Sequence, residues 1–208
     1  MHIIQPKTSV NISDRNVLTI SNQIDNKELG NKFILAKNCS LVSDSLSANG
    51  TFAVVTDEIC SINVEEDGGY LIINTPGYNP IEHQMSFIAS GKPGNLSYID
   101  GCSNSNIIHP PRNGDPCINY LYIPPFTEQT FHTHPSLRIG MILGGEGVCN
   151  LKNGPVKLEK NLCFVLDRHE HHRFMTNEHA LWLMVFHPDS EDGPRDEFNP
   201  MKTRTYVK

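Results

Sequence analysis

Short apolar runs bounded by turn residues recur along the chain, and no long stretch keeps a helical period. In the first half such runs cover residues 32–36, 51–56, 59–64 and 70–74, the last two joined across Asp67-Gly68, a strong hairpin signal. Beyond a Gly- and Pro-containing connector at 90–97, further runs cover residues 118–123, 129–134, 138–143, 148–151, 156–158, 162–166, 171–175 and 180–186. About eight short strands so closely spaced predict a sandwich or barrel, and therefore an all-β protein.

The two halves of this pattern indicate different parts of one fold. Residues 96–208 are expected to form the barrel with a polar C-terminal tail, and residues 1–95 an N-terminal β-rich extension or subdomain. Three interpretations of the first part are open: a separate subdomain, a degenerate repeat of the barrel, or extra strands wrapped onto it. Because this part contains only His2 and His83, a repeat would lack the histidine clusters of the second half.

Composition changes this picture little but excludes several partners. Of 208 residues, 38% are hydrophobic and 19% are charged, an ordinary globular balance in a chain long enough to bury a sizeable core. The net charge is −6 and the lysines and arginines are scattered, so we expect no nucleic acid and no membrane as partner. No apolar run approaches the roughly 18 residues of a membrane span, and no signal-peptide core follows Met1, so a cytoplasmic protein is expected.

The six cysteines form no Cys-x-x-Cys pair and no zinc-finger spacing. Without a secretion signal, reduced thiols are expected rather than three disulfides. Cys149 and Cys163 fall inside apolar runs and are expected to be buried, whereas Cys102 and Cys117 fall in polar segments and are the better candidates for reactivity.

Histidines concentrate in the second half of the chain, in two clusters. His132 and His134 are two residues apart, and in a strand the side chains at i and i+2 point to one face. The second cluster, at 169–172, follows an apolar run, and residues 167–170 are expected to form the turn into the next strand. Because a barrel makes neighbours of strands far apart in sequence, we expect His172 to join His132 and His134 around one divalent metal ion.

This arrangement resembles the cupin superfamily, whose first motif is G-x5-H-x-H-x3,4-E-x6-G and whose second is G-x5-P-x-G-x2-H-x3-N. The first motif matches at His132, His134 and Gly145, and the histidine of the second aligns with His172. The resemblance covers roughly residues 115–187 and implies a double-stranded β-helix, the jelly-roll barrel of that superfamily. The remaining motif positions depart from the pattern: in place of glycine, glutamate, glycine, proline, glycine and asparagine stand Phe126, Arg138 or Ile139, Asn161, Asp167, His169 and Thr176.

The ligand set predicts the chemistry of the site. Three neutral imidazoles suit Fe(II), Zn, Ni, Cu or Mn(II), and without a carboxylate ligand the full charge of the ion remains to attract an anionic substrate. An all-histidine cupin site resembles that of thiol dioxygenases, so Fe(II) is favoured. Arg138 is expected to hold a substrate carboxylate bidentately, and Glu170 to act as general base or fourth ligand, a place that His169 could also take. Asp167 and Asn119 are candidates to orient the ligating rings.

Three functions are open on this basis. The favoured one is an Fe(II)-dependent oxygenase acting on a small carboxylate-bearing metabolite, such as a thiol or an amino-acid derivative. The alternatives are a non-redox Zn or Mn enzyme, such as an isomerase, lyase or rearranging cupin with Glu170 as base, and a non-catalytic module that binds a small ligand. The resemblance also implies a homodimer.

Overall fold

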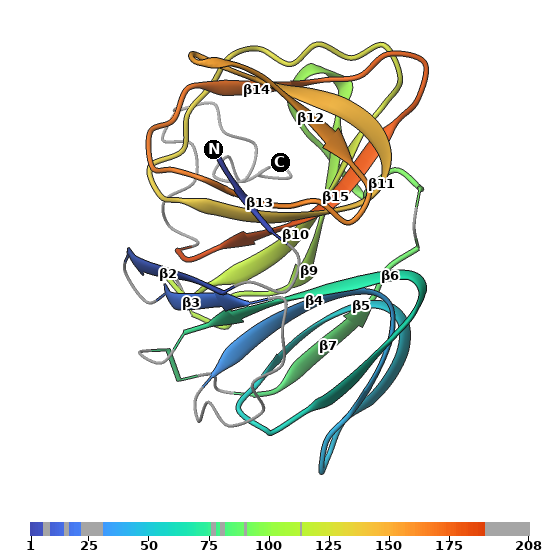
Figure 1. Cartoon of the computed structure of the whole chain (residues 1–208), viewed down its shortest axis with the longest axis vertical. Coiled ribbons are helices and arrows are strands. Elements are labelled where there is room, and N and C mark those ends of the chain that lie inside the picture. Colours follow the sequence, from blue (N-terminus) through green and yellow to red (C-terminus); the bar gives the residue numbers. More distant parts are fainter. Residues whose placement is uncertain are drawn as a thin grey trace, which may run out of the picture.

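The computed structural model describes residues 1–5, 9–14, 17–21, 31–75, 78–79, 82–89, 91–112 and 114–189. Within these residues the chain is almost entirely strand, with no α-helix and one short 3-10 turn, η1 (Ile99–Gly101). The strands form two antiparallel sheets, which are stacked as the upper and lower halves of Figure 1. The prediction of an all-β protein is therefore confirmed. None of the described segments is a helix with the length and apolarity needed to span a bilayer.

The lower sheet is built from the N-terminal part of the chain. Its strands follow the order β2 (Ser9–Asp14), β3 (Val17–Ser21), β6 (Ser61–Asn74), β4 (Lys32–Val42), β5 (Ser47–Thr56) and β7 (Gln84–Phe87). Alternation along β4 divides its side chains between two cores: Phe33 and Leu35 face the upper sheet, while Ile34 and Ala36 pack into an apolar cluster on the other face.

The hairpin expected at Asp67-Gly68 is wrong, because β6 continues through these residues and pairs with β4 on both sides of them. The pair marks a bulge instead: the register of β4 against β6 shifts between Lys37 and Cys39, and Asp67 takes a positive φ of 59°. A Cβ at Gly68 would lie 2.4 Å from the carbonyl oxygen of Asn38, so only glycine fits this close approach.

The upper sheet forms the barrel. Its main path is β1 (His2–Ile4), β13 (Cys163–Leu166), β11 (Arg138–Leu151), β15 (Leu181–His187), β10 (Cys117–Ile123), β9 (Ser103–Ile108) and β8 (Leu96–Ser97). Two further strands, β12 (Gly154–Glu159) and β14 (His172–Met175), pair with the second half of β11, whereas β13 pairs with its first half. The long strand β11 therefore belongs to both walls of the barrel (Figure 1).

A glycine bend allows β11 to pass between these walls. The sequence predicted two strands, at 138–143 and 148–151, but they are one strand whose pairing with β15 shifts register between Ile142 and Gly144. Gly145 has a φ of 75°, and a Cβ there would lie 1.8 Å from the carbonyl oxygen of Ala180. The glycine that ends the first cupin motif is thus required by the backbone.

The segment 129–134, also predicted as a strand, is irregular in the structure. It makes only isolated bridges, in which Glu128 pairs with Met175 and His132 with His172. Backbone hydrogen bonds at these bridges nevertheless hold the segment beside β14. The first histidine cluster is therefore fixed in place without a regular ladder.

The two sheets share one apolar core. The ring of Phe33 on β4 packs edge-on against that of Phe186 on β15, with ring centroids 4.9 Å apart, and both side chains are fully buried. Burial of a side chain of this size stabilises the fold by about 1.5–3 kcal/mol. Moreover, the N-terminal strand β1 pairs with β13 in the barrel. The N-terminal part of the chain thus contributes a strand to the barrel as well as the lower sheet. The division of the chain at residue 95 stays a prediction.

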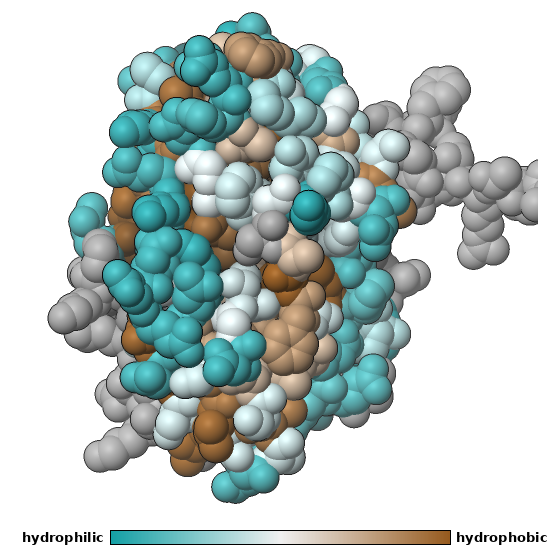
Figure 2. Space-filling view, turned by 90° about the vertical axis from the view of Figure 1, so that its right-hand side faces the viewer, coloured by the Kyte–Doolittle hydropathy of each residue, from teal (hydrophilic) through white to brown (hydrophobic). Residues whose placement is uncertain are grey.

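The surface in Figure 2 is largely hydrophilic, with apolar residues exposed in patches. Exposed apolar side chains of the lower sheet and its loops include Val42, Ile59 and Phe87, and scattered exposure of this kind is ordinary for a folded protein. The homodimer stays a prediction.

All six cysteines are free and buried. This agrees with reduced thiols, and with burial of Cys149 and Cys163. Cys102 and Cys117, expected to be the more reactive, are buried as well, and burial raises the pKa of both thiols, that of Cys117 to about 12. Their greater reactivity stays a prediction. Cys117 begins β10, and Cys102 is enclosed between η1 and β9, where neither thiol ionises readily.

Candidate metal centre

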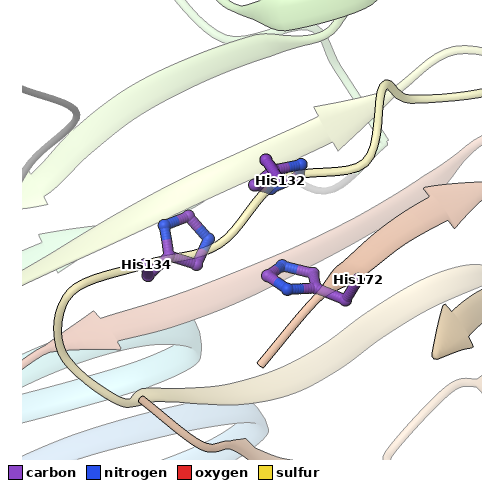
Figure 3. Close-up of side chains that lie close together, drawn as sticks. All are labelled: His132, His134 and His172. Carbon is purple, nitrogen blue, oxygen red and sulfur yellow. The ribbon is translucent and has the colours of Figure 1, made fainter. Parts of the chain in front are cut away.

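Three imidazoles converge between the segment 129–134 and strand β14. His132 and His172 lie directly opposite each other, because the backbone N–H of each donates to the carbonyl of the other, at 3.0 and 3.1 Å. His134 follows two residues later, and its carbonyl accepts from the N–H of His169 at 2.8 Å. One nitrogen from each of the three histidines lies within 4.8 Å of the other two (Figure 3).

Backbone carbonyls orient two of these rings. Nδ1 of His132 lies 2.9 Å from the carbonyl oxygen of Thr130, and Nδ1 of His172 lies 2.9 Å from that of Glu170. A neutral imidazole carries one N–H, so donation from Nδ1 leaves a lone pair on Nε2. Nε2 of His172 is buried and has no hydrogen-bond partner in the protein. Such a nitrogen, turned toward two more imidazoles, fits a metal ligand.

The spacing of the rings also fits one ion. Imidazole nitrogens bind Zn at about 2.0–2.1 Å, which separates three ligands of one ion by about 3–3.5 Å. The ring centroids lie 4.5 to 5.0 Å apart in the three pairs, so small rotations of the side chains bring the nitrogens together. Neither Asp, Glu nor Cys joins this group among the described residues.

Burial keeps these imidazoles neutral. It lowers the pKa of His132, His134 and His172, that of His172 to about 4, and the charge of Arg138 lowers all three further. Because only the unprotonated ring coordinates a metal, the three side chains are in the binding form at neutral pH. The sequence-predicted trio is thus brought together by the fold; that it binds a metal stays a proposal.

A cavity of about 50 Å³ opens beside the three histidines. Its apolar wall is formed by side chains from the four strands β10, β13, β14 and β15: Leu121, Phe164, Leu166, Phe174 and Val185. Its polar lining includes Arg138, which is 3% exposed and donates from its guanidinium to the Ser136 hydroxyl at 2.6 Å and to the Leu137 carbonyl at 2.9 Å. Arg138, expected to face the substrate, is therefore at the cavity.

Glu170 lies elsewhere. Its carboxylate pairs with the α-amino group of Met1 and accepts from the N–H of Asp167 at 3.2 Å, and it neither joins the histidine group nor lines the cavity. Its contribution to the centre is its carbonyl, which orients His172. A role for Glu170 as base or ligand stays a prediction without support from this geometry.

Two other candidates also lie away from the three-histidine group. His169 is exposed in the turn, outside the three-histidine group. Asp167 contacts His2 at 2.8 Å rather than one of the three grouped imidazoles. The rings of His132 and His172 are oriented by backbone carbonyls. Because every residue carries a carbonyl, no pattern of side chains could have located these acceptors.

Sequence reasoning missed several residues of the cavity. Gln129 is 1% exposed, and its side chain accepts from the Phe174 N–H at 3.2 Å. Tyr98 and Asn104 also line the cavity. The signal for Gln129 was its place three residues before His132, whereas Asn104 stands in a polar stretch that resembles a loop.

Three glycines of the cupin motifs are replaced in this chain, but the left-handed backbone conformation that favours glycine is kept at these positions. Phe126, Asn161 and His169 have φ values of 56°, 64° and 58°. Such left-handed conformations are uncommon outside glycine, yet all three replaced glycines fall on them. The alignment of both motifs is therefore supported by conformation as well as by the histidines.

No protein-family model matches the sequence, and none of the curated proteins matches it. Solved structures do match. A protein from Pseudomonas aeruginosa provisionally described as glyoxylate induced has a TM-score of 0.60 at 13% identity, over 87% of this chain and 74% of that chain. The cupin 2 conserved barrel domain protein from Leptotrichia buccalis has a TM-score of 0.52 at 13% identity, over 88% and 90%. Salicylate 1,2-dioxygenase from Pseudaminobacter salicylatoxidans has a TM-score of 0.55 at 11% identity, over 76% and 64%.

At these identities the likeness shows the fold alone. The chain has the cupin fold, as its motifs predicted. Within that fold it carries a group of three histidines that could hold a metal ion.

Proposed function

We propose that the protein is an Fe(II)-dependent oxygenase that acts on a small carboxylate-bearing metabolite. The observation that carries the proposal is the centre itself: three neutral imidazoles with no carboxylate among them, one of them with a buried Nε2 that has no protein partner. Imidazole ligands suit iron, and an ion held by neutral ligands alone keeps its full charge. When bound, Fe(II) would supply the redox chemistry with O2 that no protein side chain provides.

The residues around the centre support an anionic substrate. The buried guanidinium of Arg138 lines the cavity and offers planar donors to a carboxylate. Its positive charge adds to that of the ion, so an anion entering this cavity is attracted by both. The apolar wall lowers the polarity of the same space, which strengthens these interactions.

A non-redox Zn or Mn enzyme is less well supported by the same geometry. That alternative depended on Glu170 as base, and this carboxylate is engaged by Met1 and Asp167 outside the cavity. The proposal of an oxygenase needs no carboxylate base, because the substrate can be activated by direct contact with the ion.

The test is O2 consumption by protein loaded anaerobically with Fe(II) and mixed with a panel of small thiols, amino acids and hydroxy acids. We expect uptake with at least one carboxylate, lost in His132→Ala and His172→Ala. The matched control is His179→Ala, which removes an exposed imidazole from a surface turn. Loaded protein that consumes no O2 with any member of the panel contradicts the oxygenase, and substrate turnover by the Zn form without O2 favours the alternative.

A further inference from the structure

Two asparagines bring unpaired acceptors to the cavity. Asn104 on β9 and Asn119 on β10 both line it, and the amide oxygen of each is buried without a hydrogen-bond partner in the protein. A buried acceptor left unpaired costs about 1–3 kcal/mol, so two in one small cavity indicate that something other than the protein satisfies them.

The sheet register places both side chains on the cavity face. Asn104 pairs across the sheet with Leu121, which lines the cavity, and Asn119 stands two residues before Leu121 on the same face of β10. Asn119 is also opposite Val185 on β15, another lining residue. The two amides therefore share a wall with the apolar lining, and they join a space that also contains the three histidines.

The charge around the amides determines which donor suits them. Arg138 is buried in the same lining and brings a positive charge, to which a bound divalent ion would add. An ammonium group would be repelled by these charges, whereas a hydroxyl group is a neutral donor and is not. The cavity of about 50 Å³ has room for a few water-sized groups, and so for a compact aliphatic molecule.

We propose that the site binds a small aliphatic hydroxy acid, whose hydroxyl donates to the amide oxygens of Asn104 and Asn119. The carboxylate end rests on the proposed function, which assigns it to Arg138 and the metal. The hydroxyl end is independent of that assignment, since it depends only on the two amides. This narrows the substrate from any small carboxylate to one that carries a hydroxyl group.

The probes are lactate and propionate, which differ by one hydroxyl, and the measurement is their dissociation constants by calorimetry. Metal-free wild-type protein is titrated first, because there the hydroxyl cannot chelate an ion. We expect lactate to bind about fivefold or more tightly than propionate, the size of one to two neutral hydrogen bonds. Equal affinities, or no binding of either acid to metal-free and metal-loaded protein, overturn the proposal.

Variants then assign the preference to the amides. Asn104→Leu and Asn119→Leu keep the side-chain size and remove the acceptor, and each should reduce the lactate preference toward one in both forms of the protein. The matched control is Asn106→Leu: this residue also has a buried, unpartnered amide oxygen and pairs with Asn119, but it does not line the cavity. An unchanged preference in whichever leucine variant folds contradicts the assignment.

Metal content is measured separately on each sample, so the two proposals fail in different ways. If the protein binds no metal but the metal-free form prefers lactate, the oxygenase proposal is refuted and the proposal of a hydroxyl site stands. Protein that binds Fe(II) but does not distinguish the two acids keeps the metal centre and loses the hydroxyl site.

Discussion

Acid should destabilise the metal-free protein through one buried histidine in particular. The perturbation is a fall in pH from 7 to 4, compared between wild type and His172→Gln. His172 is 1% exposed, and burial lowers its pKa to about 4, against 6.5 for an ordinary histidine. Glutamine has a similar size and stays neutral over this range, so the variant removes the titration while leaving a polar side chain at the start of β14.

The sign follows from which state takes up the proton first. Above pH 6.5 the ring is neutral in both the folded and the unfolded chain, and His172 adds no pH dependence. Between pH 6.5 and about 4 the unfolded chain binds a proton that the folded chain does not, so the free energy of unfolding falls by about 1.4 kcal/mol per pH unit. The full loss is about 3 kcal/mol, and it is complete once the folded protein also protonates.

The assay is urea unfolding of both proteins at half-unit steps of pH, in a chelator. Wild type should lose about 2 kcal/mol more than His172→Gln between pH 6.5 and 5. His179→Gln, the change at an exposed ring, should follow wild type. Parallel pH profiles for wild type and His172→Gln would show that the ring at 172 is solvated in the folded state, and the reasoning from its burial would fail.

The remaining predictions concern the metal, the support of its ligands and the backbone. Excess Zn at 100 times its dissociation constant should stabilise wild type by about 2.7 kcal/mol at pH 7, measured by thermal or urea unfolding, and should not stabilise His134→Ala. Asp100 accepts from the N–H and hydroxyl of Thr130, at 2.6 and 3.2 Å, and the Thr130 carbonyl orients His132. Asp100→Ala should therefore weaken metal binding about tenfold in a chelator competition, and Asp100→Asn should have an intermediate effect. Equal metal affinities of the wild type and the variants would refute this link. Phe126, 79% exposed with a φ of 56°, should gain about 0.5–1 kcal/mol of stability on change to glycine and nothing on change to alanine, as measured by urea unfolding.

The sequence predicted the strands that contain long apolar runs, and it missed β1, β2, β3, β7, β8 and β9. Segment 103–108 begins Ser-Asn-Ser-Asn, which is typical of a loop, but it forms β9 and supplies Asn104 to the cavity. Its first four residues are polar on both faces of the sheet, so the alternation that marks other strands is absent. Hydrophobic patterning therefore fails at a strand of this composition, although it located the other strands that line the cavity.

Long strands were divided for a related reason. The sequence predicts a hairpin at Asp67-Gly68 and two separate strands on either side of 144–147, but these residues form the bulge in β6 and the bend in β11. In both places the residue permits a positive φ or a close approach, and the local sequence is the same whether the chain then reverses or continues. Only the pairing with a distant strand decides, and a single sequence does not contain that pairing.

The cupin motifs show the opposite case, in which distant structure was accessible because a few residues are fixed by chemistry. Of the motif positions in this chain, the three motif histidines and Gly145 are retained as residues. Three motif glycines are replaced, but their backbone conformation is retained at Phe126, Asn161 and His169. A residue at positive φ is tolerated at a cost of about 1–2 kcal/mol, so side-chain identity can drift there while the turn persists. A histidine that must offer a nitrogen to an ion has no such substitute. Arg138 stands where the motif has a glutamate, and its side chain lines the cavity. This substitution changes the charge of the cavity, whereas the substitutions of the glycines leave the backbone conformation unchanged.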